Sequence, residues 1–119
     1  MRKILGTLVL LLLFGNVNAQ LKALDSLKFL LKSSTSDSSR LRLYFQLSNE
    51  CSEKDIPLYA NKTLDLGQKL MSSPNFSAKD KKRFTHFIAS AYNDMGYYFR
   101  MIGNSDTSFY LYGKALDLF

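Results

Sequence analysis

The segment Ala91–Leu118 constrains the fold more than any other part of the chain. Its sequence, AYNDMGYYFRMIGNSDTSFYLYGKALDL, repeats apolar residues at the three- and four-residue spacings of two amphipathic helices. The run Gly103-Asn104-Ser105-Asp106 between them is rich in turn-forming residues. Small residues stand where two helices would touch, and aromatic residues fill the wider positions of the same faces. This pattern predicts a helical hairpin whose two helices approach closely.

Three shorter helices are predicted upstream of this hairpin. The serine-rich run 33–39 ends the first helix, because its side chains compete for backbone hydrogen bonds. We expect Asp37 to cap the second helix and Asp55 to cap the third, where Pro57 has no N–H to lose. The third helix is expected to end at about Met71. The buried positions predicted from the spacing are Leu21, Leu24, Leu27 and Leu31 in the first helix, Leu43, Leu47 and Cys51 in the second, and Leu58, Leu64, Leu66 and Leu70 in the third.

A long fourth helix is predicted from about Ala78 to Met101. The run 72–75 breaks the preceding helix, and Ser77 with Asp80 forms a weak capping-box signal. Ser105 or Asp106 is expected to cap the last helix. The predicted apolar stripes are Phe84, Ile88, Ala91, Tyr92, Met95 and Phe99 in the fourth helix, and Phe109, Tyr112, Ala115 and Leu116 in the fifth. Because no stretch alternates as a strand would, the predicted fold class is all-α.

The two halves of the helical region share an internal pattern. The run Lys62-Thr63-Leu64-Asp65-Leu66 lines up with Lys114-Ala115-Leu116-Asp117-Leu118. The second half resembles a tetratricopeptide repeat (TPR), in which small residues let helices approach and aromatic residues fill the remaining space. The residues at the packing positions of the family are Tyr92, Met95, Gly96, Phe99, Gly103, Tyr112 and Ala115. The resemblance implies helical hairpins stacked as a short solenoid, an αα-superhelix. A generic helical bundle is the alternative, because any short helical hairpin shares part of the motif.

The resemblance also suggests how the chain is organised. Residues 20–36 form an N-terminal helix and a serine-rich loop, 37–71 a degenerate TPR-like hairpin, and 78–119 a TPR hairpin. The first hairpin is degenerate because Ser48, Cys51 and Thr63 stand where the family has glycine, an aromatic residue and alanine. In a solenoid the inner helix presents its polar residues to a groove, so the resemblance implies partner binding by Asn93, Tyr97 and Arg100.

Residues 1–19 are interpreted as a signal peptide. Arg2 and Lys3 precede an apolar run from Ile4 to Phe14, and residues 17–19 suit a signal peptidase that cuts before Gln20. The run is shorter than the ~20 residues that span a bilayer, so an uncleaved membrane anchor is the less favoured alternative. The expected location is the periplasm or the medium.

A narrower likeness concerns the start of the exported chain. The run Leu24-Asp25-Ser26-Leu27, followed by Asp37 to Arg40, resembles the exported N-terminal TPR region of Bacteroidota-type signalling proteins. This resemblance implies a sensing or scaffolding segment, or a fragment, of a larger protein for signal transduction. The alternative is a self-standing periplasmic helical protein. It would homodimerise through an uncapped apolar C-terminal face, which further repeats would otherwise cover.

Enzymatic chemistry has little support in the sequence. A phosphate-binding glycine loop, a nucleophile elbow and a recognisable carboxylate pair are all missing, so we expect no catalytic activity and no cofactor. His86 has too few potential ligands around it for a metal site. The basic run Lys79–Arg83 is interpreted as an exposed helix start, and export makes nucleic acid a poor partner. Cys51 is the only cysteine, so an internal disulfide is impossible. We expect it to be buried, with intermolecular pairing as the alternative.

Overall fold

The computed structural model describes residues 19–119. The predicted signal peptide, except its last residue Ala19, and the apolar run of the alternative membrane anchor lie outside this described part. Ala19 and Gln20, which flank the predicted cleavage, are described, and their structure does not test the cleavage. Within residues 19–119, none of the helices combines the length and the apolar character needed to cross a membrane.

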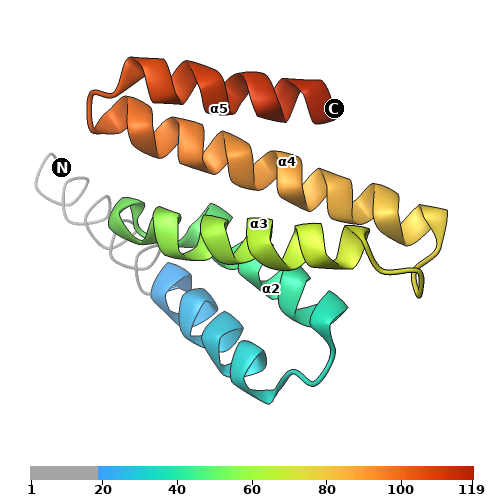
Figure 1. Cartoon of the computed structure of the whole chain (residues 1–119). Helices are drawn as coiled ribbons and strands as arrows, with labels where there is room; N and C mark the ends of the chain where they lie inside the picture. Colours follow the sequence, from blue (N-terminus) through green and yellow to red (C-terminus); the bar gives the residue numbers. More distant parts are fainter. Residues whose placement is uncertain (1–18) are drawn as a thin grey trace, which may run out of the picture.

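Five helices and a short turn of 3₁₀-helix make up the described part of the chain. Residues 19–33 are helical. They are followed by α2 (Asp37–Glu50), the 3₁₀ turn η1 (Glu53–Asp55), α3 (Ile56–Met71), α4 (Ala78–Met101) and α5 (Ser105–Leu118). The helices α3, α4 and α5 lie side by side in chain order, each antiparallel to the next, and α2 packs on α3 (Figure 1). The predicted all-α fold class is confirmed.

Two predicted helix starts are also confirmed. Ser77 caps α4: its Oγ accepts a hydrogen bond from the Asp80 N–H at 3.1 Å and donates one to the Asp80 carboxylate at 3.0 Å. Asp55 occupies the N-cap position of α3, but its side chain forms no capping hydrogen bond, and Pro57 is the second residue of the helix. Its missing N–H therefore removes no helical hydrogen bond.

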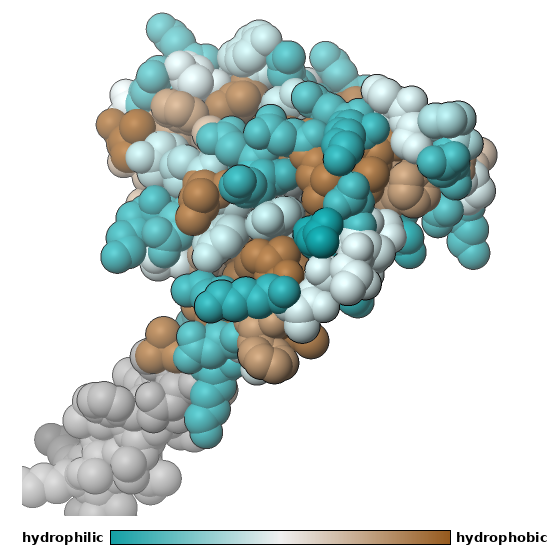
Figure 2. Space-filling view, turned by 60° about the horizontal axis from the view of Figure 1, so that its bottom comes forward, coloured by the Kyte–Doolittle hydropathy of each residue, from teal (hydrophilic) through white to brown (hydrophobic). Residues whose placement is uncertain are grey.

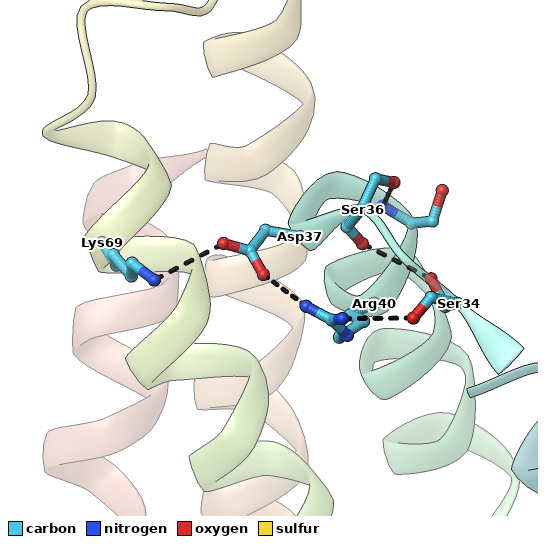
Figure 3. Close-up of polar contacts among 6 residues, drawn as sticks. Ser34, Ser36, Asp37, Arg40 and Lys69 are labelled. Atoms are coloured by element: carbon cyan, nitrogen blue, oxygen red, sulfur yellow. Dashed lines mark hydrogen bonds and ion pairs between the residues drawn. The ribbon is translucent and has the colours of Figure 1, made fainter. Parts of the chain in front are cut away.

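The start of α2 differs from the prediction. Ser36, not Asp37, is the N-cap, and its Oγ accepts a hydrogen bond from the Ser39 N–H at 3.2 Å. Asp37 is already helical, and its two carboxylate oxygens lie 2.7 Å from Arg40 and 3.4 Å from Lys69 (Figure 3). Since both oxygens contact cations, the Asp37 side chain joins α2 to α3 instead of capping α2.

The turn between α4 and α5 depends on Gly103. This residue has a φ of 86°, in the left-handed region that glycine adopts without strain. Its N–H donates to the Arg100 carbonyl at 3.2 Å, and the Asn104 N–H donates to the Phe99 carbonyl at 2.8 Å. The pair of bonds is a Schellman motif, which satisfies the last carbonyls of α4 and reverses the chain within a few residues.

The cap of α5 was predicted one or two residues too late. Asn104 is the N-cap, and its Oδ1 accepts a hydrogen bond from the Thr107 N–H at 3.2 Å. Ser105 and Asp106 are the first helical residues instead. Because the turn is so tight, the residue after Gly103 already serves as the cap.

The helix α4 lies at the centre of the fold because it contributes to both hydrophobic clusters. One cluster joins it to α2 and α3, and the other joins it to α3 and, through Leu111, to α5. The buried members are Leu41, Leu70, Phe84 and Phe87 in the first cluster and Ile56, Ala60, Ala91 and Met95 in the second.

Four large apolar residues predicted to be buried are exposed. They are Leu21 (54% exposed), Leu58 (54%), Phe109 (77%) and Leu116 (74%). On the face shown in Figure 2, apolar side chains likewise form separate patches with hydrophilic side chains between them. The reason lies in the helix contacts. The side of α3 that is buried includes Ala60, Thr63 and Gly67, and the buried side of α5 consists of Ser108 and Ala115. Small residues therefore form the middle of these contact sides, with Ile56 and Leu70 buried near the two ends of α3, and the four residues named above remain outside.

Candidate partner-binding surface

One exposed stripe of α4 carries all three residues predicted to bind a partner. The buried residues of this helix point to the two clusters, and a separate set at three- and four-residue spacing stays accessible. We call this set the α4 face. It consists of Lys79, Arg83, His86, Ser90, Asn93, Tyr97 and Arg100.

Tyr97 is the best-defined side chain of the α4 face. It is 37% exposed, and its hydroxyl donates a hydrogen bond to Oε1 of Glu53 at 3.1 Å. The Arg100 guanidinium lies 5.8 Å from the centre of the Tyr97 ring. Hydrogen bonding to the Glu53 carboxylate, and then its negative charge, raise the pKa of Tyr97, so this residue stays a neutral phenol. The Tyr97 side chain is thus held by Glu53 while part of it stays exposed.

Asn93 is half-buried between the helices that flank the α4 face. Within residues 19–119, its side-chain amide forms no hydrogen bond. The amide offers one acceptor and two donors to a peptide backbone. Asn93, Tyr97 and Arg100 therefore lie together on one side of α4 and present three different groups: an amide, an aromatic ring and a cation.

Two side-chain hydrogen bonds join α2 to α4 along the edge of the α4 face. Ser48 Oγ donates to Oδ2 of Asp94 at 2.6 Å, and Ser90 Oγ donates to Oδ1 of Asn49 at 3.3 Å. Burial raises the pKa of Asp94, while the hydrogen bond from Ser48 opposes this rise. Asp94 was not predicted as a site residue. Its position next to Met95, near the apolar side of a long amphipathic helix, could have indicated a partly buried carboxylate.

The residues assigned to repeat packing are only partly enclosed. Met95, Gly96 and Ala115 are buried, whereas Tyr92, Phe99 and Tyr112 are half-buried and Gly103 is exposed in its turn. Tyr92 also lines a cavity of about 520 Å³ between α3, α4 and α5. There Lys114 Nζ lies 5.6 Å from the centre of the Tyr92 ring.

Two other residues singled out in the sequence do not form reactive sites. His86 is exposed and packs at 5.9 Å, centre to centre, against the rings of both Phe45 and Phe119. Cys51 is half-buried at the end of α2, not fully buried as predicted, because it follows the last helical residue. Burial, followed by the charges of Asp55 and Asp94, raises the pKa of Cys51 to about 11. A thiol with such a pKa is a poor nucleophile at neutral pH.

Between residues 19 and 119, His, Cys, Asp and Glu side chains form no group of three that could hold a metal ion. No protein-family model, no curated protein and no solved structure matches this chain.

Proposed function

We propose that this chain is an exported protein–protein interaction module of the TPR type. In this proposal the hairpins α2–α3 and α4–α5 stack as a short solenoid, and the α4 face binds a segment of a partner protein. The module would serve as the sensing or scaffolding part of a larger signalling protein. The observation that carries the proposal is the position of Asn93, Tyr97 and Arg100 on one accessible side of the central helix, with Tyr97 fixed by Glu53.

Helix contacts formed by small residues support the repeat assignment. A β-carbon at Gly67 would lie 2.7 Å from Cγ1 of Ile88, and one at Gly96 would lie 2.9 Å from the Tyr112 ring. The first glycine brings α3 close to α4, and the second brings α4 close to α5. Stacked repeats depend on such close approaches between successive helices.

Selection of peptides from a random display library tests the proposal. The full chain is immobilised beside a variant carrying Tyr97→Ala and Arg100→Ala. A matched control carries Tyr59→Ala and Lys62→Ala on α3, away from the α4 face. We expect a defined set of peptides that bind the wild type and the control but lose binding to the α4 variant. Peptides that bind all three proteins equally, or a library that yields none, would refute the proposal. Circular dichroism spectra of the variants are compared with that of the wild type to check that each variant is helical.

The exposed side of α5 favours a second candidate, a self-standing periplasmic protein that homodimerises. Phe109, Leu116 and Phe119 are 77%, 74% and 66% exposed, and they follow one another at helical spacing along α5. Such a stripe suits a second copy of the chain. Light scattering and thermal unfolding at several concentrations test this candidate. A dimer whose melting temperature rises with concentration, and which Leu116→Lys dissociates, supports it. A monomer at all concentrations excludes it.

A further inference from the structure

We propose that the α4 face selects an acidic partner segment. This inference rests on the function proposed above and adds the chemical character of the partner. It also gives a role to the basic run Lys79–Arg83, which the sequence analysis interpreted only as an exposed helix start.

Two adjoining cavities make the start of α4 cationic. The larger has about 570 Å³, and Lys79, Lys82, Arg83 and His86 line it together with apolar side chains at the end of α5. The smaller has about 220 Å³ and lies between α2 and α4, where Arg42 and Arg83 face two serines. Neither cavity is lined by an Asp or Glu side chain. An anionic side chain placed here would meet cations from both helices.

The other end of the α4 face repeats this arrangement on a smaller scale. Arg100, Ser105, Ser108, Phe109 and Tyr112 line a cavity of about 300 Å³, again without a carboxylate. Cavities elsewhere differ. The cavity between α2 and α3 combines Arg40, Lys62 and Lys69 with the carboxylates of Asp37 and Asp65, and the cavity between α3, α4 and α5 combines Lys114 with Asp117. The cavities along the α4 face therefore differ from the other two in that their cations have no Asp or Glu side chain beside them in the lining.

The acidic residues nearest to the α4 face are already engaged. Asp80 forms an ion pair with Arg83 at 3.5 Å and accepts a hydrogen bond from the Ser77 hydroxyl. Glu53 accepts from Tyr97, and Asp94 accepts from Ser48. Lys79 and Lys82 have no carboxylate within ion-pair distance among residues 19–119. They remain available to carboxylates of a partner.

The spacing of the cations sets the length of the segment. Lys79 and Arg100 are separated by twenty-one residues of continuous helix, which is about 32 Å at 1.5 Å per residue. An extended peptide covers this distance with about ten residues. The structure therefore fits a segment of that length with acidic residues toward both ends. Aromatic or aliphatic residues between them would meet the exposed rings of Tyr97 and Phe109.

Fluorescence anisotropy with designed peptides tests the inference on the full chain. The probe is a labelled extended peptide of about ten residues, with Asp and Glu near both ends and Phe and Leu between. A second probe replaces every Asp by Asn and every Glu by Gln. The test variant carries Lys79→Glu, Lys82→Glu and Arg83→Glu. The control carries the same charge change at Lys22→Glu, Lys32→Glu and Lys62→Glu, all exposed positions outside the α4 face.

We expect the acidic probe to bind the wild type at least about tenfold more tightly than the amide probe. The test variant should lose this preference, whereas the control should retain it within about threefold. The preference should also decrease between about 20 and 200 mM salt, because exposed charges are screened. Circular dichroism spectra of the three proteins must match.

The outcomes separate this inference from the proposed function. If both probes bind equally and Tyr97→Ala still abolishes binding, the preference for acid is refuted and the interaction module stands. If neither probe binds and the peptide library also yields nothing, both proposals fail. If a single-stranded oligonucleotide competes as well as the acidic probe, or the control variant loses as much affinity as the test variant, the attraction is unspecific and the inference is refuted.

Discussion

The α-carbon of Gly96 faces the ring of Tyr112 so closely that a β-carbon at position 96 would lie 2.9 Å from Cδ1 and Cε1 of that ring. The same turn of α4 contacts α5 a second time, because Ser108 Oγ donates a buried hydrogen bond to the Gly96 carbonyl at 2.7 Å. Gly96 thus forms the centre of the α4–α5 contact.

Gly96→Ala is expected to destabilise the protein, although alanine is the better helix former. The added methyl group forces the Tyr112 ring to shift, and such overpacking costs about 1–3 kcal/mol, more than the ~1 kcal/mol gained in helix propensity. Gly113→Ala is the matched control, since a β-carbon there meets no atom within 4 Å. It should stabilise α5 by about 0.5–1 kcal/mol. Urea unfolding measures both, and effects of the same sign would contradict the close approach of α4 and α5.

The close contact at Gly96 was predictable, and the spacing also placed Leu47, Phe84 and Ile88 correctly in the core, whereas the exposed leucines of α3 and α5 were not predicted. Small residues at the repeat positions indicated where helices meet, and Met95, Gly96 and Ala115 are indeed buried. The exposed positions of Leu58 and Leu116 were missed because hydrophobicity alone directs leucine inward. The structure instead places the small residues inward, since they permit the shorter distance between helix axes.

Asp37→Asn tests the junction between α2 and α3. The change removes the ion pairs with Arg40 and Lys69 (Figure 3), of which the pair with Lys69 links the two helices. These groups are partly exposed, so the loss should be at most about 1 kcal/mol at low salt and smaller in about 1 M NaCl. Asp106→Asn is the control, because it lies in the first turn of α5 and forms no ion pair within residues 19–119. A loss for Asp37→Asn that does not depend on salt would contradict the ionic origin.

The side chains of the α4 face could be grouped from the sequence, but their surroundings could not. The spacing of Asn93, Tyr97 and Arg100 along one helix placed them on a common side. The hydrogen bond from Tyr97 to Glu53 joins residues that are 44 positions apart, and the one from Ser48 to Asp94 joins residues 46 apart. These hydrogen bonds depend on how α2 and the η1 turn pack against α4, which the local spacing of residues does not determine.

Asp94→Asn should stabilise the protein at neutral pH and change how its stability varies with pH. Burial raises the pKa of Asp94 in the folded state above the ordinary value of 3.8. Between these two pKa values the folded state binds more protons than the unfolded state, so the contribution of Asp94 becomes less favourable as the pH rises through this window. Above the window the ionised side chain is a cost. Asparagine keeps an acceptor for Ser48 and removes the charge.

The measurement for Asp94→Asn is the free energy of unfolding from pH 3 to 8, compared with the wild type. The gain in stability of the variant should be larger at pH 7 than at pH 3. Asp65→Asn on the exposed side of α3 serves as the control and should show no such difference. A variant that is destabilised at pH 7 would mean that the ionised Asp94 carboxylate stabilises the contact with Ser48.

The rate at which Cys51 is alkylated tests the burial and the raised pKa of a second side chain in the same region. With a pKa of about 11 in place of 9.0, the folded protein carries about a hundredfold less thiolate at pH 8 than the unfolded chain. Iodoacetamide should therefore modify the folded protein about ten- to a hundredfold more slowly than the protein in urea. Equal rates in the two states would contradict both the burial and the raised pKa.

The Asp94→Asn variant should also affect this rate, which links the two measurements. Burial is the largest cause of the raised pKa of Cys51, followed by the negative charges of Asp55 and Asp94. Removing the charge of Asp94 lowers the pKa of Cys51 only in part, so labelling of the folded variant should be faster than that of the wild type yet slower than in urea. If labelling becomes as fast as in urea, Asp94→Asn has instead opened the contact between α2 and α4. In that case the stability of the variant at pH 7 must fall as well.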